Sequence, residues 1–430
     1  MSRPHCKPSL LFSALAVSAA VVAAGCSKAP EAAPAQGAES AASEGSWDSG
    51  PEPDPIPQAL EAMPVEPSTG PHAPNANPFE GAEFFVNPKY VAKIENTMKT
   101  AKELAPKLKK LTKVPTAIWL DSIASLEKID PALEAAGKQQ KAKGKPVVPV
   151  FVVYDLPNRD CSAKASAGEL STDADGEARY RSEFIDPIAK AFAANPKQRI
   201  VAILEPDSLP NMATNLSVPK CAESDVIYRN SVAYAISKLS LPNVYIYLDA
   251  AHAGWLGWDN NRNKMAQIFK EVIDKAGGPD TIRGFATNVS NFNAIEGEFG
   301  KKLEPSNPAP NELTYVQLMA ETLEKAGISG KGFIIDTARN GQADIRSKWG
   351  NWCNVKGAGL GERPKVQPTE LLDAYFWIKP PGESDGVADP NAPRFDENCA
   401  SQDAAAGAPQ AGEWFESYLL ELVKNANPPL

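Results

Sequence analysis

Along most of the chain, short runs of β-branched and aromatic residues alternate with longer stretches in which apolar positions recur at helical spacing. Such alternation is typical of repeated β/α units, in which helices cover buried parallel strands. Seven runs have the length and composition of buried strands: Val114–Leu120, Val147–Tyr154, Arg199–Leu204, Val244–Leu248, Ile282–Thr287, Gly332–Ile335 and Ala374–Ile378. Helical periodicity marks Asp225–Leu239, Ala266–Lys275 and Glu413–Asn425. The pattern predicts an α/β fold, a seven-stranded parallel β/α barrel over residues 82–430.

A polar side chain follows nearly every predicted strand. In chain order these are Asp121, Asp155, Asp160, Glu205, Asp207, Asp249, Asn288, Asp336, Lys379, Glu383 and Asp385. The C-terminal strand ends of a β/α barrel converge on one face, where active sites lie. A single such residue, for example Asp121, is as easily a helix N-cap. Carboxylates after six of the seven strands instead favour an active site at that face.

Composition narrows the class of ligand. The chain has 430 residues and a formal charge of −9, which argues against a broad nucleic-acid interface. A neutral polymer is at least as compatible with this net negative charge as a charged ligand is. No C-x-x-C pair is present and His252 is the only histidine after residue 72, so no zinc site is expected. No glycine-rich phosphate loop follows the first strand, which disfavours a dinucleotide fold. We expect neither metal nor cofactor.

The N-terminal region differs from the rest of the chain. Residues 1–25 have a positive start and an apolar run, Leu10–Ala24, that is typical of a signal peptide. The run ends in Ala-Ala-Gly-Cys, which resembles a bacterial lipobox with Cys26 as the acylated residue. A plain secretory signal with an incidental cysteine is the alternative. Residues 26–81 are rich in Pro, Ala, Ser and acidic residues, which predicts a disordered linker. We therefore expect an exported protein, anchored to the cell envelope by lipid or else secreted.

Four cysteines remain in the predicted domain: Cys161, Cys221, Cys353 and Cys399. An even number of cysteines in an exported chain favours disulfides over free thiols. Four cysteines allow three pairings, among which the spacing alone does not choose.

Six segments at the strand ends carry a family resemblance: Tyr154–Cys161, Ile203–Leu209, Tyr247–Trp255, Ala286–Asn291, Trp352–Asn354 and Lys379–Gly386. Through them the chain resembles glycoside hydrolase family 6, the cellobiohydrolases and endoglucanases that cleave cellulose with inversion. The likeness covers roughly residues 110–430, in order. It implies a distorted, TIM-barrel-like barrel, β-1,4-glucan as the substrate and a protein that acts as a monomer. Inverting glycosidases hold two carboxyl groups about 6.5–9.5 Å apart, with room for a water molecule.

The resemblance also implies catalytic roles. Asp207 matches the general acid, and Asp160 matches the carboxylate that supports the acid's protonation and helps to pass a proton from water. A nearby like charge raises the pKa of such an acid. Asp385 matches the position of a base or transition-state contact. Tyr154 matches the tyrosine beneath the distorted sugar ring, and Ser166 the serine that holds the catalytic water.

Further positions match substrate-binding residues and disulfides. The polar binding positions are Arg159, Asp249, His252, Asn288, Lys379 and Glu383. Arg159 has an alternative as a structural partner of Asp155 or Asp160. Trp119 matches the sugar platform on the non-reducing side, and Trp255, Trp258 and Trp352 those on the leaving side; Trp349 and Trp377 are interpreted as structural. The family's disulfides correspond to Cys161–Cys221 and Cys353–Cys399. Ala251 stands where the family commonly has Gly, which leaves the exact contact of His252 open.

Two loops bear on the mode of cleavage. The long stretch between Cys353 and Cys399 and the run after Cys161 resemble the cellobiohydrolase branch, so we expect exo-acting release of cellobiose. An endo-acting glucanase is the alternative. A lipid-anchored oligosaccharide-binding protein would need the tryptophans, but not Asp160, Asp207 and Asp385 together. A serine hydrolase is disfavoured because the Gly-x-Ser-x-Gly stretch at Gly382–Gly386 does not lead directly into a predicted helix, as a nucleophile elbow must.

Overall fold

The computed structural model describes residues 76–173 and 175–430. The predicted signal peptide, the acylated Cys26 and most of the predicted linker lie outside the described residues. Among the residues described, no helix combines the length and apolar character needed to span a membrane.

The main sheet has the strand order β2-β4-β5-β6-β7-β8-β10-β9. Its strands are β2 (Ile118–Leu120), β4 (Val150–Val153), β5 (Ile200–Leu204), β6 (Val244–Asp249), β7 (Gly284–Thr287), β8 (Gly332–Asp336), β9 (Lys365–Val366) and β10 (Leu372–Phe376). The seven predicted strands are all present and pair in parallel. Two short additions were not predicted: the antiparallel edge strand β9, and β1 (Glu83–Phe84), which pairs with β3 (Val147–Val148).

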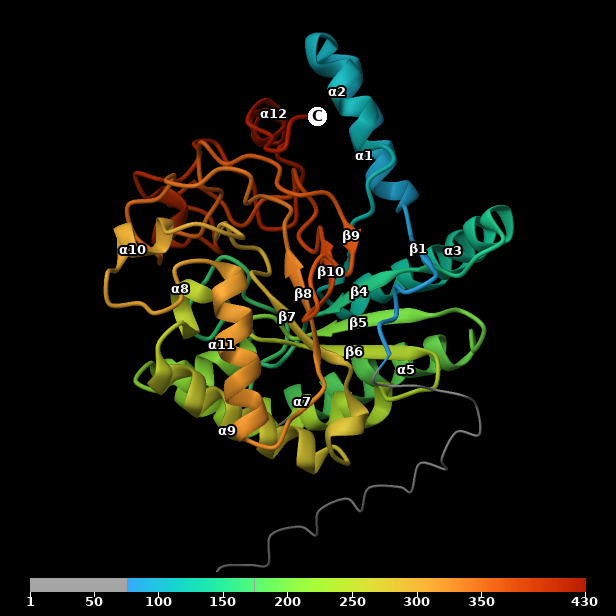
Figure 1. Ribbon diagram of the computed structural model, residues 1–430, viewed down its shortest axis with the longest axis vertical. Helices are drawn as coiled ribbons and strands as arrows, with labels where there is room; N and C mark the ends of the chain where they lie inside the picture. The colour runs from blue at the N-terminus through green and yellow to red at the C-terminus, as the bar shows by residue number, and fades with distance from the viewer. Residues whose placement is uncertain (1–75, 174) are drawn as a thin grey trace, which may run out of the picture. The chain divides into compact units, whose positions relative to one another are not determined.

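Helices cover the outer side of the sheet, and Figure 1 shows α7, α9 and α11 lying alongside its strands. The α-helices are α1 (Pro88–Thr100), α2 (Ala105–Leu111), α3 (Ile129–Lys143), α4 (Gly176–Arg179), α5 (Asp186–Ala193), α6 (Ser208–Thr214), α7 (Pro219–Leu239), α8 (Ala253–Leu256), α9 (Asp259–Lys275), α10 (Phe299–Leu303), α11 (Glu312–Lys325) and α12 (Glu416–Lys424). Short 3₁₀ or π segments occupy Lys102–Leu104, Ile123–Lys128, Tyr180–Ile185, Pro279–Thr281 and Glu397–Ala400. The predicted helices are confirmed, although α7 and α9 begin earlier than predicted. The first turn of α7, Pro-Lys-Cys-Ala, has no large apolar residue and that of α9 is polar, so neither gives an apolar period.

The packed chain begins earlier than predicted. Phe79 was assigned to the linker, yet it is only 1% exposed and packs among the inward-facing strand residues, with ring contacts to Phe84 and Phe376. The Asn77 side-chain amide also donates to the carbonyl of Asp373 at 3.0 Å. The packed segment therefore begins about five residues before the predicted boundary at residue 82. One aromatic residue in a proline-rich stretch produces no periodic signal.

The curled sheet is open along one seam, between β2 and β10. No ladder joins these two strands. Two hydrogen bonds cross the seam: Ala117 N–H donates to the Trp377 carbonyl at 3.1 Å, and the Trp119 indole N–H donates to the Ile378 carbonyl at 2.9 Å. The predicted parallel barrel is thus confirmed as a strongly curled sheet whose closure is incomplete.

Candidate active site

Two cavities of about 380 and 510 Å³ lie where the predicted site residues converge. Both are lined by Trp119, Tyr154, Ser166 and Lys379, so they adjoin, and we call the two together the channel. Most of the predicted site residues line this channel: Trp119, Tyr154, Arg159, Asp160, Ser166, Asp207, His252, Trp255, Trp352, Lys379, Glu383 and Asp385. Asp249, Asn288 and Trp258 do not line it.

Strained backbone marks the strand ends that surround the channel. Asp160, Glu205, Asp207 and Asn288 have φ values of 55°, 51°, 63° and 59°. Asn and Asp tolerate this left-handed region better than most residues, whereas Glu does not share that advantage. Such strain persists only where surrounding contacts hold it, and it is concentrated at functional sites.

Asp207 is a partly buried acid that lies shortly after the end of β5. Burial is the main cause that raises its pKa well above the usual range, and the nearby carboxylates Asp249 and Asp160 raise it further. Asp249 accepts hydrogen bonds from the backbone N–H groups of Asp207 at 3.0 Å and Ala251 at 3.2 Å. Burial raises the pKa of Asp249 to about 7. Asp207 therefore keeps its proton near neutrality, as a general acid must.

Asp160 lies beside Tyr154 in the centre of the channel. One carboxylate oxygen accepts the Tyr154 hydroxyl at 2.7 Å, and the other accepts the Ser166 backbone N–H at 3.0 Å. Burial first, then the charge of Asp160, raises the pKa of Tyr154 well above its usual value. Tyr154 thus remains a donor that fixes the orientation of Asp160. The Trp119 ring meets the Tyr154 ring edge-on at 5.4 Å.

Asp385 is held by two cations. Arg339 donates to one carboxylate oxygen at 2.7 Å, the Asn354 backbone N–H donates to the same oxygen at 2.8 Å, and Lys379 lies 3.6 Å from the other oxygen. Arg339 is 1% exposed. Sequence reasoning missed Arg339 as a site residue. Its only signal was a position shortly after β8, which does not reveal the ion pair.

Arg159 is enclosed by protein acceptors. Its guanidinium donates to the carbonyls of Ser166 and Asp121, both at 2.7 Å, and to that of Tyr154. It also lies 3.4 Å from Asp155. These contacts agree with the structural alternative for Arg159, and its predicted contact with substrate stays a prediction.

His252 presents one ring nitrogen to the channel wall. Its Nδ1 lies 3.0 Å from the side-chain nitrogen of Asn293. The Asn293 oxygen accepts from Arg346, which fixes the orientation of the amide. Burial, helped by Arg346, lowers the pKa of His252 to about 3. The imidazole is therefore neutral, with Nδ1 accepting from Asn293 and the hydrogen on Nε2.

Three predicted binding residues have other surroundings. Asn288 is fully buried and donates to the carbonyls of Asn293 and Asp336 at 3.3 and 2.9 Å. The Trp258 indole N–H donates to the Ser306 hydroxyl at 3.2 Å, in a hydrogen bond that is exposed to solvent. Asp249 does not line the channel, but its carboxylate accepts from the backbone N–H of Asp207, which does. Conversely, Trp349 lines the channel, although its sequence position gave no reason to separate it from core tryptophans.

Two disulfides shape the loops above the channel. They join Cys161 to Cys221 and Cys353 to Cys399, as the resemblance implied. We call residues 161–170 and 386–399 the roof loops. They meet where the Lys164 backbone N–H donates to Asp396 at 2.9 Å and Ala165 packs on the second disulfide. A Cβ on Gly386 would lie 2.6 Å from the Ala165 Cβ, so the two loops pack too closely here for a larger residue than glycine. In the described part of the chain, no cluster of three or more His, Cys, Asp or Glu residues could hold a metal.

Comparison with known proteins gives consistent matches. The family model "Glycosyl hydrolases family 6" matches residues 79–426. Exoglucanase 3 of Agaricus bisporus is 41% identical over 82% of this chain and 80% of its own length. The 1,4-β-D-glucan cellobiohydrolase CEL6A of Pyricularia oryzae is 42% identical over 82% of this chain and 73% of its own. The catalytic core of cellobiohydrolase Cel6A from Chaetomium thermophilum is 40% identical, has a TM-score of 0.80, and matches over 83% of this chain and all of that one. The catalytic domain of CcCel6A, solved with p-nitrophenyl β-D-cellotrioside, has a TM-score of 0.80 at 42% identity, over 83% of this chain and 99% of that one.

Proposed function

Because the chain belongs to glycosyl hydrolase family 6, we propose that it hydrolyses β-1,4-glucosidic bonds in cellulose and cello-oligosaccharides with inversion of configuration, chiefly releasing cellobiose. The protein is thus a glycoside hydrolase. The observation that carries the mechanism is the partly buried, protonated Asp207 in a channel lined by tryptophans. Apolar C–H faces of glucosyl rings lie well on such aromatic surfaces.

The residues divide the chemistry between two sides of the scissile bond. Asp207 protonates the leaving oxygen, while water attacks the opposite face of the distorted ring above Tyr154. Ser166 helps to hold that water, and Asp160, oriented by the Tyr154 hydroxyl, takes the proton that the water loses. Asp385, fixed by Arg339, faces the developing positive charge. One displacement by water converts a β-linkage into an α-anomeric product.

The general acid can be tested by Asp207→Asn, which removes the proton while keeping the shape. Cellotetraose hydrolysis should fall about 10²–10⁴-fold, the usual contribution of general acid catalysis, while binding stays within a few-fold. A substrate with an activated leaving group should recover much of the rate. Asp130→Asn, on the exposed start of α3, is the matched control and should behave as wild type. Unchanged turnover in Asp207→Asn would remove Asp207 from this role.

Two further readouts use the wild-type protein. Fresh product should appear as the α-anomer by NMR, and a β-anomer would overturn inversion. Tight binding of cello-oligosaccharides without any cleavage would favour the oligosaccharide-binding protein instead.

The contact between the roof loops supports exo action, because a covered channel admits a chain end more readily than a chain interior. Asp396→Ala removes the acceptor for Lys164 N–H and should loosen this cover. We expect a several-fold rise in the share of new reducing ends left in insoluble cellulose. Asp389→Ala is the control in the same loop, since in the described part of the chain the Asp389 carboxylate accepts hydrogen bonds only from nearby Asn391. If the enzyme is endo-acting, the wild type already leaves a high share of its new reducing ends in insoluble cellulose, and Asp396→Ala does not change that share.

For location and assembly, the sequence supports an exported monomer anchored through acylated Cys26, with plain secretion as the alternative. The mass of the mature N-terminus separates the two, because acylation adds a lipid to Cys26.

A further inference from the structure

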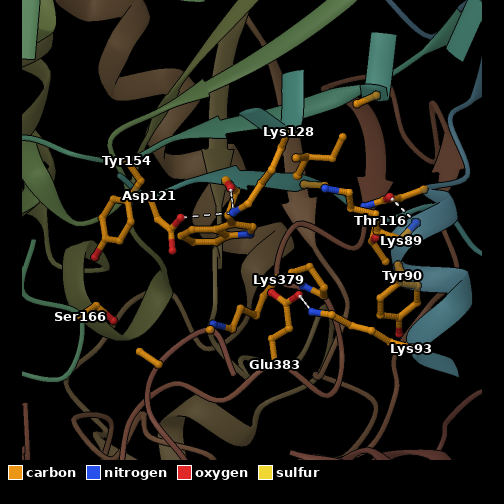
Figure 2. A pocket seen from close by; sticks show the side chains of 18 of the residues that line it. Lys89, Tyr90, Lys93, Thr116, Asp121, Lys128, Tyr154, Ser166, Lys379 and Glu383 are labelled. Atoms are coloured by element: carbon orange, nitrogen blue, oxygen red, sulfur yellow. Dashed lines mark hydrogen bonds and ion pairs between the residues drawn. The ribbon is translucent and has the colours of Figure 1, made fainter. Parts of the chain in front are cut away.

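The substrate channel continues past the Trp119 platform. Figure 2 shows Tyr154 and Ser166 at one end of the 510 Å³ cavity and Tyr90, Lys93 and Thr116 at the other, with Lys379 and Glu383 between them. In the proposed function, Tyr154 lies under the first sugar on the non-reducing side of the cleaved bond and Trp119 supports the second. The space beyond Trp119 is therefore in line with a third sugar.

The walls of this far end suit a glucosyl ring. Pro88 on α1 and Pro131 and Ala135 on α3 supply apolar surface. Lys89 supplies an exposed amino group at the start of α1. A mainly apolar pocket with a few placed polar groups is the usual form of a small-ligand site. A sugar ring offers the complement, with C–H faces and a rim of hydroxyl groups.

Two polar features at the far end strengthen this assignment. Lys93 and Glu383 form an ion pair at 2.8 Å, with side chains 39% and 18% exposed, so their outer atoms remain accessible in the cavity. Thr116 is 1% exposed, and its hydroxyl has no hydrogen-bond partner in the described part of the chain. Buried hydroxyls without partners are uncommon, and one in a cavity wall is available to a ligand after a small rotation.

We propose that this far end of the channel binds a third glucosyl unit on the non-reducing side of the scissile bond. The inference rests on the proposed function and adds to it. A chain end can then stop at the second or at the third position. The enzyme accordingly releases cellotriose from non-reducing ends in addition to cellobiose.

Cellopentaose labelled with ¹⁸O at its reducing end tests the proposal, because the label separates the two registers. Binding with two sugars on the non-reducing side gives unlabelled cellobiose and labelled cellotriose. Binding with three gives unlabelled cellotriose and labelled cellobiose. We expect wild type to produce both sets in its initial products.

Ala135→Phe places a ring in the far end and should lower the unlabelled-cellotriose fraction at least several-fold, with cellotetraose cleavage into two cellobioses unchanged. Ala142→Phe, the same substitution at the exposed end of α3, is the matched control and should keep the wild-type ratio. Lys89→Ala, at an exposed position that does not endanger folding, should lower the fraction in the same direction.

If cellobiose is the only unlabelled product that wild type yields, the third position is overturned and the proposed function is left intact. The same holds if folded Ala135→Phe and Lys89→Ala both keep the wild-type ratio. Absence of any cleavage by wild type would instead contradict the proposed function itself.

Discussion

At the scale of single residues, the site depends on charges that are buried with their partners. Asp385 and Arg339 are 5% and 1% exposed, and their ion pair is 2.7 Å long. Removing one partner of such a pair leaves an uncompensated buried charge. Removing both charges together avoids that penalty.

This predicts a large coupling in a double-mutant cycle. Arg339→Met should lower the free energy of unfolding by about 3–5 kcal/mol, because Asp385 then has the more distant Lys379 as its remaining cation beside the Asn354 N–H. Adding Asp385→Asn should recover part of that loss, so the two effects are not additive. Urea denaturation of the four proteins measures the coupling, and simple additivity would show that the pair is not a stabilising unit.

The same residues show what the sequence can and cannot reveal. Asp160, Asp207 and Asp385 could be predicted because each follows a strand, and parallel strands end on a common face. Arg339 could not, since an arginine shows its importance only through a carboxylate distant in the chain. Trp349 failed for a similar reason: a tryptophan in the core and one in a channel wall have the same sequence signature.

At the scale of secondary-structure elements, a buried acid ties β5 to the segment after β4. Glu205 accepts the Tyr180 hydroxyl at 2.8 Å and the backbone N–H groups of Asp155 and Leu156 at 3.3 and 3.4 Å. Burial raises the pKa of Glu205 to about 7 and that of Asp155 to about 8. Both acids are therefore protonated in the folded protein at pH values where they ionise in the unfolded chain.

The sign of the pH dependence follows from this difference. The stabilisation by Glu205 is complete below its unfolded pKa of 4.5 and is lost as pH rises through about 7, a change of roughly 3 kcal/mol. Glu205→Gln should therefore flatten the fall in melting temperature between pH 5 and pH 7. Glu103→Gln, at an exposed position in a 3₁₀ segment, is the control. An unchanged slope in Glu205→Gln would mean that other groups cause the fall.

The elements themselves were predictable where they were long or strongly patterned. All seven parallel strands are apolar runs, whereas β1 and β9 have two residues each and are fixed only by their pairing partners. The first turns of α7 and α9 likewise lack large apolar residues at helical spacing, so the sequence does not show where these helices begin.

At the scale of the whole molecule, the segment before β1 belongs to the fold. A truncated variant that starts at Ala76 should keep wild-type activity and stability. One that starts at Gly81 lacks Phe79 and should lose about 3–5 kcal/mol of unfolding free energy, as core Phe→Ala substitutions do. Chemical denaturation of both variants measures the difference. Phe79→Ala in the longer variant should reproduce most of the loss, and equal stability of the two truncations would contradict this role for Phe79.

The seam between β2 and β10 gives Trp119 two roles at once. Its ring is the proposed sugar platform, and its indole N–H makes one of the two hydrogen bonds that cross the seam. Occupancy of the channel and closure of the sheet are therefore thermodynamically linked, so a bound cello-oligosaccharide should raise the unfolding temperature. For the same reason, the affinity lost in Trp119→Ala sums two contributions, stacking and sheet closure. Comparison with Trp119→Phe, which keeps a ring but has no N–H, separates them.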